Sequence, residues 1–280
     1  MQVHHRYVKI QGHQVFYREA GPVDAPTVVL LHGFPTSSHM YRFLIPQLAD
    51  RFHVVAPDYL GYGASDSPSV DEFEYSFASM ASVIKDFLVE LKIDRFALYI
   101  QDFGAPIGLR IATEHPEWVT AIVTQNGNAY FEGIGADYQP VLAGEPTEEH
   151  LRGAISAAAT KGQYLDGEPD PSLVSPDSWL HDQTLLDRPG NDLIQFAMLR
   201  DYKTNVARYP QFHEYFRTSQ VPLLAVWGNG DPIFVPAGAS AFRTDLPDAR
   251  IHLIDGGHFA LEAHLDEIVA LIRPFLSDSL

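Results

Sequence analysis

The sequence is poor in three features: cysteine, positive charge and long apolar runs. It contains no cysteine among its 280 residues, which excludes disulfide scaffolds, thiolate metal sites and a cysteine nucleophile. Its 19 Lys and Arg residues stand against 36 Asp and Glu residues, for a net charge of -17. Such a charge repels nucleic-acid backbones and anionic membrane surfaces, so we expect neither as a partner. No apolar run approaches the length of about 18 residues that a membrane span needs.

The N-terminus also lacks the basic segment and apolar run that mark a secretory signal. We therefore expect a cytoplasmic protein. Hydrophobic residues make up 46% of the chain and charged residues 20%, which is typical of a folded globular protein. The length allows one or two domains.

Short apolar runs recur along the chain. Such runs are typical of strands that are buried on both faces of a parallel sheet. Stretches with helical spacing of apolar residues separate them at residues 80–91 and 107–112, so the alternation predicts a doubly wound α/β fold. An N-terminal hairpin is expected around Gly12. The strands expected after this hairpin cover residues 27–31, 54–56, 96–100, 121–124, 223–227 and 251–254.

The strand rhythm stops in the middle of the chain, where helix-like patterns occupy residues 148–159 and 192–202. A segment of about 90 residues without a strand is too long for a loop. We therefore predict an inserted helical cap over residues 129–214, and a core made of residues 1–128 and 215–280.

Polar residues that follow three of the expected strands carry the candidate chemistry. Ligands bind at the carboxyl ends of the strands in an open α/β sheet, so we expect Asp102, Asp231 and His258 to lie together. Asp102 stands at a sharp turn between a strand and a helix, where the helix N-terminus favours a carboxylate. The three residues follow the order of nucleophile, acid and base in α/β-hydrolases. The backbone N–H groups of Phe34 and Phe103 are the expected oxyanion hole.

Each member of this triad also has a plainer interpretation. Asp102 could cap the helix that follows it, and Asp231, which precedes a proline, could simply start a turn. His258 could be a packed core histidine. The catalytic interpretation is favoured because Asp102, Asp231 and His258 follow three strands in the order of nucleophile, acid and base. His32, by contrast, is expected to be a structural residue of its loop.

Four motifs make the sequence resemble the α/β-hydrolases, in the branch that holds haloalkane dehalogenases and epoxide hydrolases. The likeness covers roughly residues 5–128 and 215–278. It implies an α/β-hydrolase fold, a mostly parallel sheet with an inserted cap, and a hydrolase with Asp102 as its nucleophile. The motifs are His-Gly-Phe-Pro-Thr-Ser-Ser at 32–38, Asp-Tyr-Leu-Gly-Tyr-Gly-Ala-Ser-Asp at 58–66, Gln-Asp-Phe-Gly at 101–104 and Gly-His-Phe at 257–259.

An aspartate at the nucleophile position indicates displacement at a saturated carbon. A serine attacking such a carbon would form an ether, whereas a carboxylate forms an alkyl ester that water can open. In the second step His258, oriented by Asp231, would deprotonate the water that attacks Asp102. The N–H groups of Phe34 and Phe103 would stabilise the resulting oxyanion. We therefore expect a small, neutral, apolar electrophile as the substrate, with water as the second reactant.

The leaving group has two interpretations. Haloalkane dehalogenases of this branch usually carry Trp after the nucleophile, where this sequence has Phe103, and in the cap only Trp179 could donate to a halide. Epoxide hydrolases of this branch place cap Tyr hydroxyls against the epoxide oxygen, and our candidates for that role are Tyr164 and Tyr202. They also usually have His where this chain has Gln101. We favour an epoxide hydrolase that forms vicinal diols, with a haloalkane dehalogenase as the alternative.

A third possibility is that the same scaffold serves a cofactor-free oxygenase or a non-catalytic ligand-binding protein. The 13 histidines show no metal-ligand spacing such as HExxH. We therefore expect neither a metal nor a cofactor, and the sequence leaves a homo-oligomer open.

Overall fold

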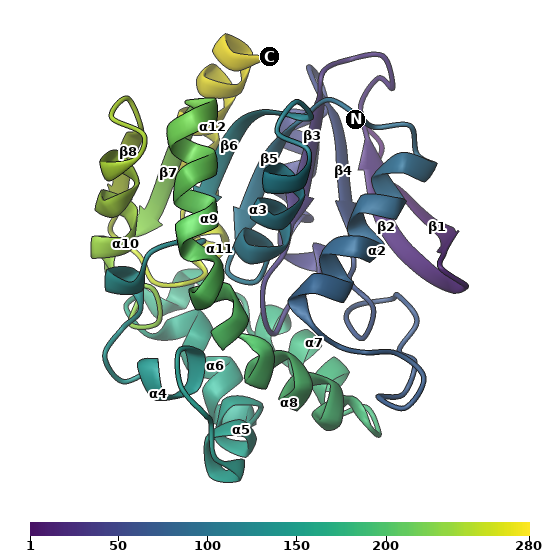
Figure 1. Cartoon of the computed structure of the whole chain (residues 1–280), viewed down its shortest axis with the longest axis vertical. Coiled ribbons are helices and arrows are strands. Elements are labelled where there is room, and N and C mark those ends of the chain that lie inside the picture. Colours follow the sequence, from purple (N-terminus) through teal and green to yellow (C-terminus); the bar gives the residue numbers. More distant parts are fainter.

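One eight-stranded sheet organises the computed structural model, which describes residues 1–280 (Figure 1). The strand order is β1-β2-β4-β3-β5-β6-β7-β8. β2 is antiparallel to both β1 and β4, and all other neighbours are parallel. The predicted hairpin and doubly wound α/β sheet are confirmed. The strands are β1 (His4–Ile10), β2 (His13–Ala20), β3 (Thr27–Leu31), β4 (His53–Pro57), β5 (Phe96–Gln101), β6 (Val119–Gln125), β7 (Leu223–Gly228) and β8 (Arg250–Ile254).

Helices cover both faces of the sheet because its central strands are apolar on both sides. Along β5, Leu98 and Ile100 pack into one hydrophobic cluster, whereas Ala97 and Tyr99 pack into another. Successive side chains of a strand point to opposite faces, so the two clusters are the two layers of the core. Helices α2, α3 and α9 lie over one face and α12 lies behind the other (Figure 1). The core helices are α1 (Leu44–Leu48), α2 (Phe77–Glu90), α3 (Gly104–Glu114), α10 (Pro236–Ala241), α11 (Ala260–Ala263) and α12 (Leu265–Ser279), with 3-10 turns η1 (Ser38–Tyr41) and η4 (Phe242–Thr244).

β8 departs from the prediction that every apolar run is buried on both faces. The side chains of β4, β5 and β7 are all buried, but Leu253 of β8 is 50% exposed. β8 is the last strand of the sheet and pairs only with β7. The prediction is therefore wrong for β8, because an edge strand has only one neighbour to help cover it.

The segment between β6 and β7 is helical, as predicted. The single helix expected over residues 148–159 is wrong in detail, because the chain forms two helices there. Ser156 separates them by accepting a hydrogen bond from the backbone N of Ala159 at 3.2 Å, which caps the second helix. The inserted helices are α4 (Gln139–Leu142), α5 (Glu148–Ala154), α6 (Ala157–Leu165), α7 (Pro176–Leu186), α8 (Asn191–Asp201) and α9 (Lys203–Ser219), with 3-10 turns η2 (Phe131–Gly133) and η3 (Pro171–Leu173).

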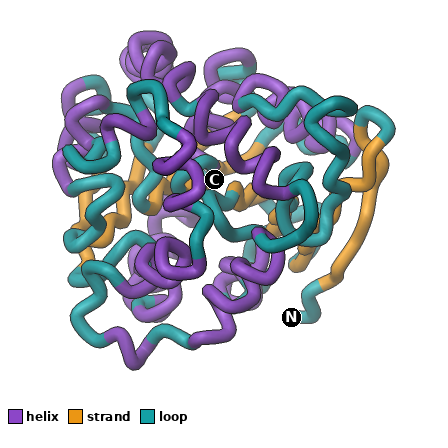
Figure 2. The backbone as a smooth tube through the Cα atoms, turned by 90° about the horizontal axis from the view of Figure 1, so that it is seen from below, coloured by secondary structure: helices purple, strands orange, loops and turns teal.

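These inserted helices lie across the end of the sheet to which the parallel strands point (Figures 1 and 2). The predicted boundary between cap and core, at residues 214 and 215, falls inside α9. That helix leaves the cap and packs against α3 of the core. None of the helices combines the length and the apolar character needed to cross a membrane.

Candidate active site

The turn between β5 and α3 holds Asp102 in a backbone conformation that is rare for a residue with a side chain. Its φ is +47°, in the left-handed region that L-residues other than glycine seldom occupy. Gly104 lets α3 begin close to β3, since a Cβ there would lie 2.1 Å from the carbonyl oxygen of Leu31. Asp102 does not cap α3, because Phe103 is the capping residue and makes no side-chain cap bond. The strained turn instead projects the carboxylate beyond the sheet.

Backbone N–H groups hold one side of this carboxylate. The N–H of Phe34 donates to Oδ1 of Asp102 at 2.6 Å. Burial raises the pKa of the Asp102 carboxyl, while the charge of His258 and the N–H groups of Phe34 and Phe103 lower it. Gly33 is required here, because a Cβ at residue 33 would lie 2.3 Å from the Cβ of Asp102. The two N–H groups predicted as an oxyanion hole thus lie against Asp102 from two different loops.

His258 and Asp231 complete a chain of polar contacts behind the carboxylate. Nδ1 of His258 lies 2.7 Å from Oδ2 of Asp231, and Nε2 lies 4.0 Å from Oδ2 of Asp102. Burial acts to lower the pKa of His258, but the charge of Asp231, their hydrogen bond and the charge of Asp102 raise it overall. The structure therefore brings together the three residues predicted from the strand ends.

Asp231 is fixed by donors on every side. Its Oδ1 accepts from the backbone N of Ile233 and Phe234 at 2.8 and 3.1 Å. The side-chain amide of Asn126 donates to its Oδ2 at 2.7 Å. The expected turn at Asp231 is thus present together with the contact to His258. Asn126 was not among the predicted site residues, although its place directly after β6 was a usable signal.

Gln101 was noted in the sequence only as a departure from the epoxide hydrolase pattern. Its side-chain Nε2 lies 3.0 Å from Nε2 of His258, and its side chain is fully buried. His32 plays the structural role expected of it, since its Nε2 accepts from the N–H of Tyr59 at 3.2 Å.

A cavity of about 400 Å³ lies between Asp102 and the cap. Its inner wall is apolar and includes Phe34, Phe103, Leu142 and Ile233. The carboxylates on its lining besides Asp102 are those of Asp137, Glu149 and Asp166, and no Lys or Arg side chain lines it. An apolar pocket with one buried nucleophile suits an uncharged organic ligand.

The predicted cap residues do not line this cavity. The hydroxyl of Tyr164 donates to Oδ2 of Asp182 at 2.5 Å, and its ring stacks on Phe259 with centroids 4.0 Å apart. Tyr202 is fully buried, with its ring centroid 5.9 Å from that of Phe103, and its hydroxyl has no hydrogen-bond partner. Trp179 packs beside Tyr164, with the Lys161 ammonium 5.9 Å from its ring centroid.

Tyr138 is the tyrosine that does line the cavity. It stands directly before α4 and is partly buried. Burial and the nearby charge of Asp231 raise the pKa of its hydroxyl, which keeps this group protonated at neutral pH. The sequence placed Tyr138 in a Tyr-rich cap but carried no signal that distinguished it from the other cap tyrosines.

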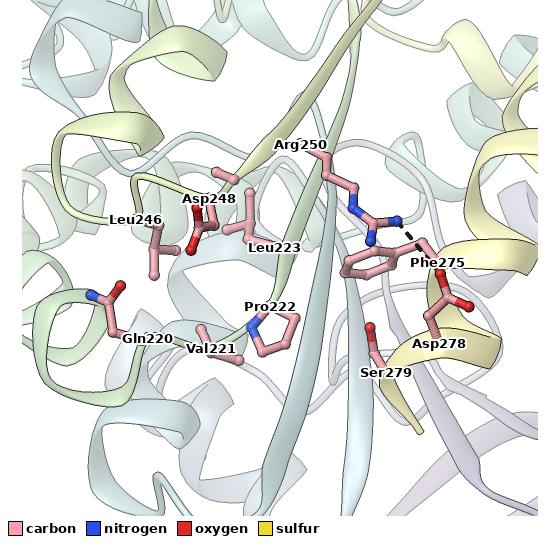
Figure 3. A pocket seen from close by; sticks show the side chains of 11 residues that line it. Gln220, Val221, Pro222, Leu223, Leu246, Asp248, Arg250, Phe275, Asp278 and Ser279 are labelled. Atoms are coloured by element: carbon pink, nitrogen blue, oxygen red, sulfur yellow. Dashed lines mark ion pairs between the residues drawn. The ribbon is translucent and has the colours of Figure 1, made fainter.

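A second cavity, of about 450 Å³, lies at the opposite end of the sheet (Figure 3). Residues 221–223 and 248–250 line it where β7 and β8 begin. Arg250 and Asp278 form an ion pair across it, with Nη1 and Oδ2 3.8 Å apart. It lies at the amino ends of the strands, away from Asp102, so we place the candidate active site in the cavity under the cap. Nowhere in the structure do three or more His, Asp or Glu side chains form a metal-binding group.

Comparison with known sequences agrees with this geometry. A profile of the family described as "alpha/beta hydrolase fold" matches residues 26–151. The uncharacterized hydrolase YNR064C of Saccharomyces cerevisiae is 40% identical over 97% of this chain and 96% of its own length. A haloalkane dehalogenase of Mycobacterium marinum is also 40% identical, but over 41% of this chain and 38% of its own.

Solved structures extend the likeness of fold to the whole chain. The structure named DBJA (mutant dbja delta) has a TM-score of 0.84 with 22% identity and covers 98% of both chains. The epoxide hydrolase CorEH has a TM-score of 0.78 with 19% identity and covers 99% of both chains. At these identities the likeness concerns the fold alone.

Proposed function

The chain belongs to the alpha/beta hydrolase fold family and is a hydrolase, and from this premise we propose that it opens epoxides through an ester on Asp102. One observation carries the proposal: the nucleophile position holds a carboxylate whose Oδ1 is bound by the N–H of Phe34 and whose Oδ2 faces Nε2 of His258. Such a carboxylate can attack a saturated carbon and then be regenerated by water.

In the first step Oδ2 of Asp102 bonds to an epoxide carbon, and the bond from that carbon to the ring oxygen breaks. The oxygen then needs a proton. Tyr138 is our candidate donor, because its hydroxyl is protonated and its side chain lines the same cavity. This step leaves an alkyl ester on Asp102.

In the second step water attacks the carboxyl carbon of Asp102 while Nε2 of His258 takes the water proton. The charge that develops on Oδ1 is met by the backbone N–H groups of Phe34 and Phe103, and each such donor is worth about 3–4 kcal/mol in the transition state. The bond to the alkyl oxygen then breaks, and this oxygen takes the proton from His258. The products are a diol and the acid form of Asp102, whose remaining proton passes through water to the Tyr138 phenolate, so that the carboxylate and the tyrosine hydroxyl are both restored.

A haloalkane dehalogenase is the second candidate, favoured by the likeness to the Mycobacterium marinum enzyme over part of the chain. A halide that leaves into an apolar pocket needs hydrogen-bond donors. None of the three Trp residues lines the cavity, and the indole N–H of Trp227 donates to the carbonyl of Phe234 at 2.7 Å. The cavity therefore lacks a tryptophan donor for a halide, whereas the hydroxyl of Tyr138 can protonate an epoxide oxygen, and we rank the epoxide first.

The carboxylates of the cavity favour a neutral substrate. Asp102 and the three other acids repel an anionic ligand, and no Lys or Arg side chain lines the cavity to bind one. We therefore propose neutral epoxides as substrates. When a neutral and an anionic epoxide of matched size are compared, the neutral one should have the higher kcat/KM. Added salt should reduce the difference between the two kcat/KM values.

Trapping the ester tests the function. His258→Phe should leave the first step intact and stop the second, so that an epoxide adds its full mass to the peptide that contains Asp102. A bromoalkane that forms the ester with release of bromide, when no epoxide does, would favour the dehalogenase. No adduct from a broad panel of epoxides and haloalkanes would contradict both and point to a cofactor-free oxygenase or a ligand-binding protein.

A further inference from the structure

Gln101 meets the catalytic base at the nitrogen that has to accept a proton. Because Nδ1 of His258 lies 2.7 Å from a carboxylate oxygen of Asp231, the ring proton of the neutral imidazole sits on Nδ1. Nε2 then carries a lone pair, and the Gln101 amide N lies 3.0 Å from it. An amide N–H can only donate, so this contact is favourable only while Nε2 has no proton.

The contact with Nε2 decides the orientation of the Gln101 amide. Its Oε1 is buried without a hydrogen-bond partner, and a Cβ on residue 33 would lie 2.3 Å from it. Gly33 thus makes room for the oxygen. In the reverse orientation Oε1 would face the lone pair of Nε2, and two acceptors repel each other.

The charged groups around His258 favour the protonated imidazole, which is the opposite of the effect of Gln101. Asp231 and Asp102 both favour the imidazolium and raise the pKa of His258, and no cation faces the ring. Its other neighbours are the rings of Phe234 and Phe259, at centroid distances of 5.9 and 5.2 Å. The two carboxylates therefore favour the protonated form of His258, whereas the second step needs the neutral form.

We propose that Gln101 is a positioning residue that keeps Nε2 of His258 unprotonated and oriented toward Asp102 until the attacking water replaces the amide there. The inference rests on the proposed function, because it assumes that His258 acts as a base. In the second step the water takes the place of the Gln101 N–H at Nε2, transfers its proton to Nε2 and bonds to the carboxyl carbon of Asp102. Loss of the amide then shifts the protonation of His258 toward the imidazolium.

A titration of His258 by nuclear magnetic resonance tests this without any substrate. The imidazole signals of His258 are identified by their absence in His258→Phe. Gln101→Met removes the donor, so the pKa of His258 should rise by about half to one unit. Gln101→Glu replaces the donor with an acceptor of the same shape and should raise it further. Should Gln101→Met not fold, Gln101→Asn, which is one methylene too short to reach Nε2, provides the same test.

Gln125 offers a matched control. It ends β6 as Gln101 ends β5, the two residues are paired in register, and it is equally buried. Its Oε1 accepts from the hydroxyl of Tyr99 at 2.6 Å rather than contacting His258. Gln125→Met should leave the pKa of His258 unchanged. An unchanged or lowered pKa in Gln101→Met, or equal shifts in both variants, would overturn the proposal.

The pH profile of ester hydrolysis is the second readout. Because only neutral His258 can accept the water proton, the rate falls as pH drops through its pKa. The acidic limb should therefore move to higher pH in the order wild type, Gln101→Met, Gln101→Glu. A merely structural role would lower the rate equally at all pH values. If no substrate is turned over, the proposed function fails, while the titration still decides the role of Gln101.

Discussion

Two buried carboxylates lie at the junction of cap and core, and their surroundings differ. Asp102 receives the backbone N–H of Phe34 on Oδ1, and the residue lines the cavity under the cap. Asp182, on α7 of the cap, is fully buried and receives the hydroxyl of Tyr164. It belongs to a group that we call the cap clasp: Arg42, Tyr164, Ser178, Asp182 and Glu262.

Side chains, rather than backbone groups, build the cap clasp. Arg42 of the core binds both carboxylate oxygens of Glu262, at 2.9 and 2.8 Å. Ser178 of the cap donates to the same carboxylate at 2.9 Å. Rigid backbone donors prepare a carboxylate for chemistry at a fixed place, whereas side-chain partners join two parts of the chain. A buried acid in this fold is therefore a nucleophile candidate only if part of it remains open to a cavity.

Replacing each carboxylate in turn should give the largest difference in kcat/KM between the two regions. Asp102→Asn should lower kcat/KM by a factor of about 10⁴ or more, because the nucleophile is lost. Asp182→Asn should retain most of the activity, because Asp182 does not line the cavity. Steady-state kinetics on one epoxide measures both. A comparable loss in the two variants would contradict the division of roles.

Asp182 of the cap clasp should contribute to the pH dependence of stability, against an opposite contribution from His32 and His39, whose pKa burial lowers to about 3. Burial raises the pKa of Asp182 to about 7, with Glu262 raising it further and Tyr164 and Arg42 opposing the shift. The folded protein then binds a proton at Asp182 that the unfolded chain has released. The contribution of Asp182 to the free energy of unfolding is therefore present in full below about pH 4 and is lost as pH rises toward 7. The loss is about 4 kcal/mol at the ordinary slope of 1.36 kcal/mol per unit.

Urea unfolding at pH 5 and pH 8 measures the part of this loss that falls above pH 5, which is about 3 kcal/mol for the two units up to the pKa of about 7. Asp182→Asn should lack this contribution, because the amide does not titrate, so the difference in stability between wild type and variant should change by that amount between pH 5 and pH 8. Asp102→Asn serves as the comparison from the other region. A difference in stability between wild type and Asp182→Asn that is the same at both pH values would show that Asp182 does not titrate in this way.

The same comparison can be made by removing one tyrosine hydroxyl from the cavity and one from the cap clasp. Tyr138→Phe should slow ester formation by about 10²-fold, because the leaving oxygen loses its proton donor. Tyr164→Phe should leave that rate nearly unchanged but lower stability by about 1–3 kcal/mol, because it leaves Asp182 without its donor. Stopped-flow kinetics and urea unfolding measure the two effects. If Tyr164→Phe slowed ester formation and Tyr138→Phe did not, Tyr164 rather than Tyr138 would be the proton donor.

Trp179 should show the smallest effect. Its ring packs outside the cavity, so Trp179→Phe should change neither epoxide turnover nor any release of bromide from bromoalkanes. Halide release that occurs in the wild type and disappears in this variant would place the indole at the leaving group and favour the dehalogenase.

The sequence was sufficient to predict the half of the site that the sheet builds. Asp102, Asp231 and His258 follow parallel strands whose carboxyl ends converge, so their strand positions alone predicted that they meet. Phe34 could be predicted in the same way, because the loop that carries it follows the neighbouring strand β3.

The half of the site that the cap builds could not be predicted. Which of Tyr138, Tyr164 and Tyr202 faces the cavity depends on how each inserted helix is rotated against the core, and no strand register determines that rotation. Gln101 was visible as an unusual residue, but its contact with His258 spans 157 positions of the chain. Such a contact joins the last residue of β5 to the loop that follows β8, and no local pattern in the sequence indicates it.

The helix α9 has a consequence for how this protein could be recombined with its relatives. It begins in the cap and ends at Gln220, whose φ of +48° terminates the helix beside β7. A chimera joined at residue 214 would cut this helix and separate its two ends from their own partners. A join at Gln220 would transfer α9 whole, although its packing against α3 would then have to be recreated on the new host. The cap is therefore exchangeable only together with the surface of α3 that it rests on.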